Sequence, residues 1–422
     1  MNIFVIGGGG REHAIICALK KSPRVDKLYC APGNAGIARL AECLPIGVMD
    51  FDAILTAAQK ITPDMIVIGP DDPLAGGLSD ILSQAGFRVF GPSKRAAIIE
   101  SSKGFAKDLM KKYQIPTAAY ALFTEAQAAY AYISSADYPL VLKADGLALG
   151  KGVLICENES AARAGIKALM EDGSFGAAGK SMVIEEYLTG HEVSMLAFVD
   201  AKTVKPMASA QDYKRVGDND TGPNTGGMGA ISPSPHYTAS VDDFCRRHIY
   251  QKTVDAMRAE GREFKGIIFF GLMLTADGPK VLEYNARFGD PETQVVLTRM
   301  ETDLVSVLEA CMDGRLDEVE LSFTDDAAVC VVLASDGYPG DYKTGYRITG
   351  LEQFAAPGAD CHCFHAGTRH DGESNDIVTK GGRVLGVCAS GENVVAARGK
   401  AYGAASKIGF ENKYMRSDIG MT

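Results

Sequence analysis

Residues 1–15 read MNIFVIGGGGREHAI, a short apolar run that leads through four glycines into Arg-Glu-His. A strand that ends in glycines before a helix is typical of a nucleotide- or phosphate-binding turn. The dinucleotide pattern needs Gly or Ala at its third fixed position, but counting from Gly7 or Gly8 places Glu12 or His13 there. The next strand ends in APGNAG, without a carboxylate for a ribose. The turn therefore favours a phosphate at the helix N-terminus, and the alternative is a purely structural turn.

The rest of the first hundred residues alternates strands and helices. Strands are expected at NIFVI, KLYCA, DMIVIGP and RVFGP, with helices over residues 53–60 and 78–85. This alternation predicts an α/β fold with a parallel sheet and right-handed crossovers. Loop-forming clusters follow the strands, and they should meet at the carboxyl edge of the sheet, where open α/β folds bind ligands. The clusters are residues 7–10, 32–36, 69–73 and 91–93.

Bulk composition excludes several classes of protein. The chain has 422 residues, 46% of them hydrophobic and 23% charged, which suits a globular protein of about three domains. A net charge of −10 without a basic stripe argues against nucleic acid as a partner. We expect no membrane span and no signal peptide, and hence a cytoplasmic protein. The ten scattered cysteines favour reduced, buried thiols over a disulfide framework.

A second glycine-rich stretch, KADGLALGKGV at residues 143–153, lies between two strand-like runs. It differs from a Walker A loop, because only three residues separate Gly146 from Gly150 and Gly152 replaces the Ser or Thr. We expect a hairpin whose backbone amides close onto phosphates. Lys143 and Lys103 flank it, and a triphosphate needs such positive charge. A single lysine is usually a solvated surface residue, so the pair carries the argument.

Two later segments supply oxygen ligands. In KVLEYNARFGDPE, Glu283 and Asn285 share one strand face and could hold Mg²⁺, and Arg287 continues that alternation towards an anionic intermediate. The alternative is an edge strand with a polar face. In IEEYLTGHEVS, a strand that stops at Leu188 leaves main-chain groups for an adenine edge, and Glu192 could take the ribose hydroxyls. The segment CHCFH at residues 361–365 suggests a metal cluster, but a strand without metal is the preferred interpretation.

Together the motifs resemble one known family. IGGGGREHA, APGNAG, SSKGFAK, KADGLALGKGV, IEEYLTGHEVS, QDYKRVGDNDTGPNTGGMGA and EYNARFGDPETQ follow one another in this order. The chain resembles the phosphoribosylamine–glycine ligase family of the ATP-grasp superfamily over essentially its whole length. The resemblance implies a Rossmann-like pre-ATP-grasp domain at residues 1–101 and an ATP-grasp domain at 102–325, whose mobile lid subdomain spans about 120–190. It also implies a small α+β C-terminal domain at 326–422.

The same resemblance implies the chemistry. Glycine and 5-phospho-β-D-ribosylamine would be joined to give glycinamide ribonucleotide, with ATP converted to ADP and phosphate through glycyl phosphate. This is a step of de novo purine biosynthesis. The co-substrate is ATP, and the ion is Mg²⁺ or Mn²⁺. We expect a monomer or a weak dimer.

Residue roles also follow from the resemblance, matched motif by motif. The expected ATP-binding residues are Lys103, Lys143, Ala148, Gly150, Lys151, Gly152, Glu185, Leu188 and Glu192, and the expected metal ligands are Glu283 and Asn285. The expected substrate-binding residues are Gly9, Arg11, Gly33, Asn34, Asp212, Lys214, Pro223, Asn224, Arg287, Gly289 and Asp290. Lys143, Arg287 and Asp212 are the expected catalytic residues, with Asp212 orienting the glycine ammonium rather than acting as a general base.

Three other functions remain as alternatives at this point. The first is another ATP-grasp ligase, such as a carboxylase or a formyl-transferring relative, against which DTGPNTGGMGA argues. The second is a nucleotide-binding regulatory protein without chemistry, against which the combined Lys, Glu and Asn set argues. The third is a nicotinamide enzyme, which the glycine spacing already weakens.

Overall fold

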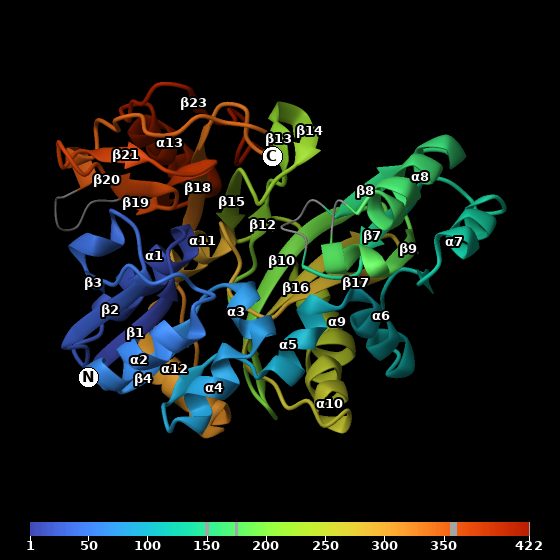
Figure 1. Cartoon of the computed structure of the whole chain (residues 1–422), viewed down its shortest axis with the longest axis horizontal. Coiled ribbons are helices and arrows are strands. Elements are labelled where there is room, and N and C mark those ends of the chain that lie inside the picture. Colours follow the sequence, from blue (N-terminus) through green and yellow to red (C-terminus); the bar gives the residue numbers. More distant parts are fainter. Residues whose placement is uncertain (148–151, 174–175, 355–360, 422) are drawn as a thin grey trace.

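The structure is a computed structural model, and it describes residues 1–147, 152–173, 176–354 and 361–421 (Figure 1). The N-terminal sheet has the strand order β3–β2–β1–β4–β5, and all its neighbouring strands are parallel, as the alternating pattern predicts. Its strands are β1 (Asn2–Gly7), β2 (Lys27–Pro32), β3 (Glu42–Cys43), β4 (Met65–Ile68) and β5 (Val89–Phe90). The accompanying helices are α1 (Gly10–Lys20), α2 (Phe51–Ile61), α3 (Asp71–Gly76), α4 (Leu78–Gln84) and α5 (Lys94–Ser101).

The glycine turns of this sheet meet at its carboxyl edge. The amide of Gly33 donates to the carbonyl of Gly7 at 3.1 Å, and the amide of Gly69 donates to the carbonyl of Ile6 at 3.0 Å. The turns after β1, β2 and β4 are therefore adjacent, as predicted for an open α/β sheet.

A separate antiparallel sheet has the order β6–β9–β7–β8. Its strands are β6 (Tyr120–Phe123), β7 (Leu140–Ala144), β8 (Val153–Cys156) and β9 (Met182–Glu186), and the nearby helices are α6 (Lys103–Lys112), α7 (Ala126–Ile133) and α8 (Glu159–Ile166). Strands β7 and β8 pair from Leu140–Cys156 to Lys143–Val153, which confirms the predicted hairpin. Strand β9 ends at Glu186, earlier than the predicted end at Leu188.

The third sheet, in the order β11–β10–β16–β17, forms the opposite wall of a cleft described below. Its antiparallel strands are β10 (His191–Asp200), β11 (Val204–Pro206), β16 (Lys265–Thr275) and β17 (Gly278–Asn285). The helices of this region are α9 (Ala239–Cys245), α10 (Gln251–Ala259) and α12 (Leu304–Asp313). Glu283 and Asn285 lie on β17, whereas Arg287 lies beyond the end of the strand rather than continuing it.

The fourth sheet combines segments from the middle and the end of the chain. Its order is β12–β15–β18–β22–β19, with β23 paired to β18. Its strands are β12 (Gln211–Asp212), β15 (Gly229–Ser232), β18 (Ala327–Ser335), β19 (Cys361–His365), β22 (Arg383–Gly391) and β23 (Lys413–Tyr414). Its helices are α11 (Glu292–Arg299) and α13 (Val394–Ala405), and the small hairpins are β13 (Arg215–Gly217) with β14 (Thr221–Asn224) and β20 (Thr368–His370) with β21 (Ile377–Thr379).

Short helical segments complete the chain. The 3₁₀ segments are Ile37–Arg39, Gly176–Lys180, Asp218–Asp220, Leu316–Glu318 and Glu352–Phe354, and the π segments are Lys167–Glu171 and Arg246–Tyr250. Among the described helices, none is long and apolar enough to cross a membrane.

Candidate active site

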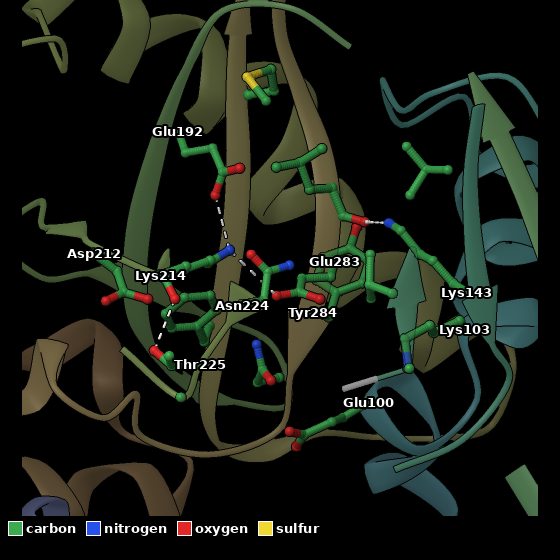
Figure 2. Close-up of a pocket in the computed structure, with 18 of the residues that line it drawn as sticks. Glu100, Lys103, Lys143, Glu192, Asp212, Lys214, Asn224, Thr225, Glu283 and Tyr284 are labelled. Carbon is green, nitrogen blue, oxygen red and sulfur yellow. Dashed lines mark hydrogen bonds and ion pairs between the residues drawn. The ribbon is translucent and has the colours of Figure 1, made fainter. Parts of the chain in front are cut away.

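A cleft of about 1440 Å³ lies between the sheet that contains β7 and β9 and the sheet that contains β10 and β17. Figure 2 shows charged side chains from both sheets pointing into it. The predicted residues that line it are Arg11, Lys103, Lys143, Gly152, Glu185, Leu188, Glu192, Asp212, Lys214, Asn224, Glu283, Asn285, Arg287 and Asp290. Ala148, Gly150 and Lys151 lie outside the described residues.

Two lysines, one on α6 and one on β7, project into the cleft. Lys103 begins α6, and its Nζ donates to the carbonyl of Gly146 at 2.8 Å. Lys143 lies on β7, and its Nζ donates to the carbonyl of Leu282 at 3.2 Å. Burial lowers the pKa of Lys103, and the nearby Glu283 carboxylate opposes that shift. Both ammonium groups are held at the cleft wall, where they could bind phosphate groups.

Glu185 occupies a different environment from the one expected for an adenine contact. Its carboxylate lies 2.9 Å from Lys143 Nζ and 2.8 Å from Lys107 Nζ, and both Glu185 and Lys107 have side chains only 2% exposed. Lys107 also donates to Thr117 Oγ1 at 2.8 Å. Burial lowers the pKa of Lys107 to about 8, against the attraction of Glu185. The contact between Glu185 and adenine stays a prediction, but the carboxylate clearly holds two lysines.

An apolar patch lies beside this ion-pair cluster. Leu188 and Met273 are both 8% exposed, and they pack with Ala118 and the partly buried Leu282. Leu188 follows the end of β9, so its backbone lies outside the sheet ladder. A flat apolar ring with polar edges would find both a packing surface and free main-chain groups here.

Lys214 connects two carboxylates of the same cleft wall, Glu192 on β10 and Glu283 on β17 (Figure 2). Its Nζ lies 2.9 Å from Glu192 Oε2 and 3.8 Å from Glu283 Oε1. Burial alone would lower the pKa of Lys214, but the two carboxylates outweigh it and raise that pKa. Conversely, burial raises the pKa of Glu283, but Lys214, Lys143 and Lys103 outweigh it and lower that pKa. Glu283 is therefore anionic at neutral pH.

Glu283 and Asn285 fit a divalent metal ion. They are two residues apart on β17, so both side chains lie on one face of the strand. The ionised carboxylate and the amide oxygen are hard ligands, which Mg²⁺ prefers, and the lysines that would hold phosphates lie close by. Asn285 Oδ1 accepts a hydrogen bond from Arg287 at 3.1 Å, which orients the amide. In contrast, no group of three or more His, Cys, Asp or Glu within the described ranges is placed to hold a metal.

Arg287 is held by two acidic groups: Glu100, which the sequence analysis did not identify, and Asp71, which lies in the predicted loop cluster at residues 69–73. One of its terminal nitrogens lies 3.2 Å from Glu100 Oε1 and 3.9 Å from Asp71 Oδ2. Glu100 Oε2 also accepts a hydrogen bond from the amide of Ala286 at 2.7 Å. Burial raises the pKa of Glu100 to about 7, although Arg287 opposes that shift. Arg287 Nε is buried and has no hydrogen-bond partner among the described residues, so a donor remains for a ligand.

Asp212 and Glu292 form an acidic pair at the other end of the cleft. Burial, and next to it the Glu292 carboxylate, raises the pKa of Asp212 well above its ordinary value. Glu292 Oε1 accepts a hydrogen bond from Ser194 Oγ at 3.0 Å, and burial raises the pKa of this carboxyl too. Asp212 Oδ1 and Gln211 Oε1 are buried acceptors without a partner in the described part of the chain. A cationic group is the ligand that would satisfy both oxygens.

The glycine turns after β1 and β2 lie behind the cleft, and their polar groups bind other parts of the protein. Gly9 donates its amide to Glu12 at 2.6 Å, and Arg11, which does line the cleft, donates Nε to the same carboxylate at 2.6 Å. Asn34 Nδ2 donates to the carbonyls of Gly8 at 2.9 Å and His365 at 2.7 Å. Substrate contacts by Gly9, Gly33 and Asn34 therefore stay predictions.

The two remaining predicted residues also lie outside the cleft lining. Pro223 is on the exposed strand β14. Gly289 packs against Glu292, because a Cβ at this position would approach Glu292 Oε2 to 2.6 Å. Gly289 therefore allows Glu292 to fold over the backbone.

Arg383 and Tyr338 reach the cleft from the fourth sheet, and the sequence analysis missed both. Arg383 donates to the carbonyl of Asp290 at 2.7 Å and to the carbonyl of Gly226. Tyr338 Oη accepts a hydrogen bond from the amide of Gly226 at 2.9 Å. The only sequence signal was an arginine set between glycines and a buried strand in GGRVLGVC. Lys107, in contrast, was detectable from its i, i+4 spacing to Lys103 on one helix.

Comparisons with known proteins cover the whole chain. Family models described as phosphoribosylglycinamide synthetase match it in three parts: the N domain at residues 1–100, the ATP-grasp (A) domain at 101–293 and the C domain at 328–422. A phosphoribosylamine–glycine ligase of Caldanaerobacter subterraneus is 46% identical over 419 residues, which are 99% of each chain. The chloroplastic enzyme of Arabidopsis thaliana is 47% identical over 97% of this chain and 78% of its own.

Solved structures show the same similarity. The phosphoribosylamine–glycine ligase of Thermotoga maritima has a TM-score of 0.86 and 35% identity, covering 99% of this chain and 100% of its own. The biotin carboxylase domain of the Hydrogenobacter thermophilus 2-oxoglutarate carboxylase, solved with MgADP, has a TM-score of 0.74 but only 14% identity, covering 98% and 91%. At that identity the second similarity concerns the fold alone.

Proposed function

The chain belongs to the phosphoribosylglycinamide synthetase family, and from this premise we propose that its cleft joins glycine to the amine of 5-phospho-β-D-ribosylamine. ATP drives the reaction, and the products are glycinamide ribonucleotide, ADP and phosphate. The reaction is a step of purine biosynthesis. The observation that carries the proposal is that a single cleft holds Lys103, Lys143 and Glu283 together with the unpartnered acceptor of Asp212.

ATP and a divalent ion, Mg²⁺ or Mn²⁺, are the co-substrate and metal of this chemistry. Lys103 and Lys143 would bind the phosphates, Leu188 the adenine and Glu192 the ribose. Glu283 and Asn285 would hold the ion, which neutralises phosphate charge when bound. Lys214, whose Nζ lies 3.8 Å from Glu283 Oε1, would share this carboxylate with the ion.

Activation of glycine solves a leaving-group problem. A carboxylate oxygen leaves poorly, so transfer of the γ-phosphoryl group to the glycine carboxylate gives ADP and glycyl phosphate, from which phosphate can depart. The protein contributes positioning and charge neutralisation to such a transfer. Lys143 would neutralise the moving phosphoryl group. Arg287 would offer its unpartnered Nε to the same anionic centre.

The acidic pair of Asp212 and Glu292 suits the ammonium group of glycine. Burial raises the pKa of both carboxyls, the Glu292 carboxylate raises the pKa of Asp212 further, and a bound ammonium would lower both pKa values. Gln211 adds a third oxygen acceptor without charge. Asp212 would thus orient glycine with its carboxylate directed towards the phosphates.

The ribosylamine would enter from the N-terminal sheet. Arg11 and Asp290 line that part of the cleft, and Arg11 donates its amide to Asp290 Oδ2 at 3.4 Å. The amine must reach the acyl phosphate beside Arg287, whose partner Glu100 lines the same region. We assign the ribose phosphate to the turns that contain Gly9, Gly33 and Asn34, and we keep Pro223, Asn224 and Gly289 as further substrate-binding residues.

We also propose a division into domains at residues 1–101, 102–325 and 326–422, with a lid subdomain at about 120–190. The separate hydrophobic cluster around Leu142, Ile166 and Ile184 supports the lid. We propose a cytoplasmic monomer or weak dimer that acts on small molecules. Ten cysteines without paired spacing favour a reducing compartment.

The test is phosphate release from ATP with glycine and freshly prepared phosphoribosylamine, each omitted in turn. Release that requires both substrates, with glycinamide ribonucleotide detected by mass spectrometry, is the expected result. Turnover that depends on bicarbonate or formate instead of glycine would indicate another ATP-grasp ligase. ATP binding without turnover under any of these conditions would indicate a regulatory protein.

A further inference from the structure

The segment that carries Asp212 and Lys214 has a second face that points away from the cleft. Side chains of an extended chain alternate, so Tyr213 points to the side opposite its two neighbours. Tyr213 is 8% exposed and packs in a hydrophobic cluster with Val329 and Ile419. The back of this substrate-facing segment therefore rests on the end of the chain.

Residues 414–420, here called the C-terminal strap, bind that back face directly. Tyr414 Oη donates to the carbonyl of Val216 at 2.8 Å. The amide of Gly420 donates to Tyr213 Oη at 3.0 Å. Strand β23 pairs with β18, which fixes the start of the strap to the fourth sheet.

Arg416 is the centre of the strap. Its side chain is 1% exposed, and its Nε and one terminal nitrogen donate to the two oxygens of Asp418, each at 2.7 Å. The other terminal nitrogen donates to the carbonyl of Arg215 at 3.0 Å and to Asp220 Oδ1 at 2.8 Å. The guanidinium also lies 5.2 Å from the ring centre of Tyr213.

These contacts join two parts of the chain that are about 200 residues apart. A buried guanidinium must satisfy its donors, so its geometry fixes the backbone at Arg215 and the side chain at Asp220 relative to the strap. Asp418 adds a further tie, because its Oδ2 accepts a hydrogen bond from the amide of Asn219 at 2.8 Å. The segment after Lys214 is thus held at several points from behind.

We propose that Arg416 is a positioning residue for the amino-acid substrate, holding residues 212–220 so that Asp212 and Lys214 face the cleft. The inference rests on the proposed function, because it takes Asp212 as the site of the glycine ammonium. Arg416 lies behind the segment and acts through it. ATP is assigned to Lys103, Lys143, Leu188 and Glu192, and none of the strap's hydrogen bonds among the described residues involves these four.

The test uses Arg416→Gln in the full chain, with steady-state phosphate release measured against glycine and against ATP. Losing charge-assisted hydrogen bonds should raise the KM for glycine by about tenfold and change the KM for ATP by less than about twofold. Arg416→Lys keeps the positive charge but not the planar guanidinium that donates several hydrogen bonds, so its KM for glycine should lie between the values of the wild type and Arg416→Gln. The control is Arg347→Gln, an exposed arginine 3.1 Å from Asp376 in the same region, with both KM values expected to stay unchanged.

A milder variant covers the case in which Arg416→Gln does not fold. Tyr213→Phe removes only the acceptor for the Gly420 amide, and we expect a rise in the KM for glycine of about threefold. An unchanged KM for glycine in Tyr213→Phe and in any folded Arg416 variant would overturn the inference. Equal rises for ATP and glycine, or a loss of kcat alone, would also overturn it, since they indicate general damage. A wild-type protein without glycine-dependent turnover would instead refute the proposed function, and the inference with it.

Discussion

Replacing Lys107 by Met should destabilise the protein far more than an ordinary lysine substitution. Lys107 Nζ lies 2.8 Å from Glu185, and both side chains are 2% exposed. At an effective dielectric constant near 20, charges at this distance attract by about 6 kcal/mol, an upper bound on the pair energy. Removing one partner of a buried pair typically costs about 3–5 kcal/mol, because the other charge stays buried. Lys143, 2.9 Å from Glu185, keeps the cost within that range by neutralising the carboxylate in part.

The assay is urea unfolding of wild type and variant at pH 7, followed by circular dichroism. Lys112→Met on the same helix is the matched control, since its pair with Glu260 at 2.6 Å is exposed (64% for Lys112) and solvent should screen most of its contribution to stability. A loss for Lys107→Met no larger than that for Lys112→Met would refute the reasoning.

Three further predictions concern activity and pH. Lys143→Ala and Glu283→Ala should each reduce glycine-dependent phosphate release by about 10³-fold or more with an unchanged circular dichroism spectrum, and near-normal turnover would contradict their roles. The pKa of Glu100 is raised from 4.5 to about 7 in the folded protein, so its stabilising contribution is complete below pH 4.5 and is lost as the pH rises through 7. Between pH 4.5 and 7.5 the free energy of unfolding of the Glu100→Gln variant should therefore fall by about 3 kcal/mol less than that of the wild type. The measurement is urea unfolding at each pH. Parallel plots of unfolding free energy against pH for the two proteins would contradict the prediction. Chelation by EDTA should abolish phosphate release and added Mg²⁺ or Mn²⁺ should restore it, whereas activity that persists in EDTA would exclude a metal at Glu283 and Asn285.

Features with a local cause could be predicted from the sequence. The parallel order around β1 follows from alternating strands and helices, and the β7–β8 hairpin follows from two apolar runs that flank a glycine stretch. The shared face of Glu283 and Asn285 follows from the two-residue period of a strand. Each of these features follows from the residue pattern within a strand or from the succession of neighbouring strands and helices, where periodicity and turn chemistry are informative.

Features that depend on distant partners could not be predicted. Nothing in the sequence around Glu185 indicates that it pairs with two lysines, because it resembles any acidic residue near the end of a strand. Arg383 and Arg416 hold loops more than 150 residues earlier in the chain. The fourth sheet combines β12 and β15 with strands from the chain end, so it crosses the boundary that the resemblance implies at residue 325. These contacts depend on which distant segments pack together in the fold, and no local sequence pattern indicates that.

The charged side chains of the cleft pair with one another, so a nucleotide can bind to them only by replacing some of these ion pairs. A phosphate can take Lys143 only by drawing it away from Glu185, which lies 2.9 Å away. The buried carboxylate would then be left uncompensated unless a second cation remained, and Lys107 at 2.8 Å is that cation. Lys103 and Lys107 are one helical turn apart on α6. The same helix would therefore supply Lys103 to bind a phosphate and Lys107 to neutralise Glu185 when Lys143 moves away from it. Lys107, which is buried beside Glu185, would thus lower the free-energy cost of turning Lys143 towards ATP.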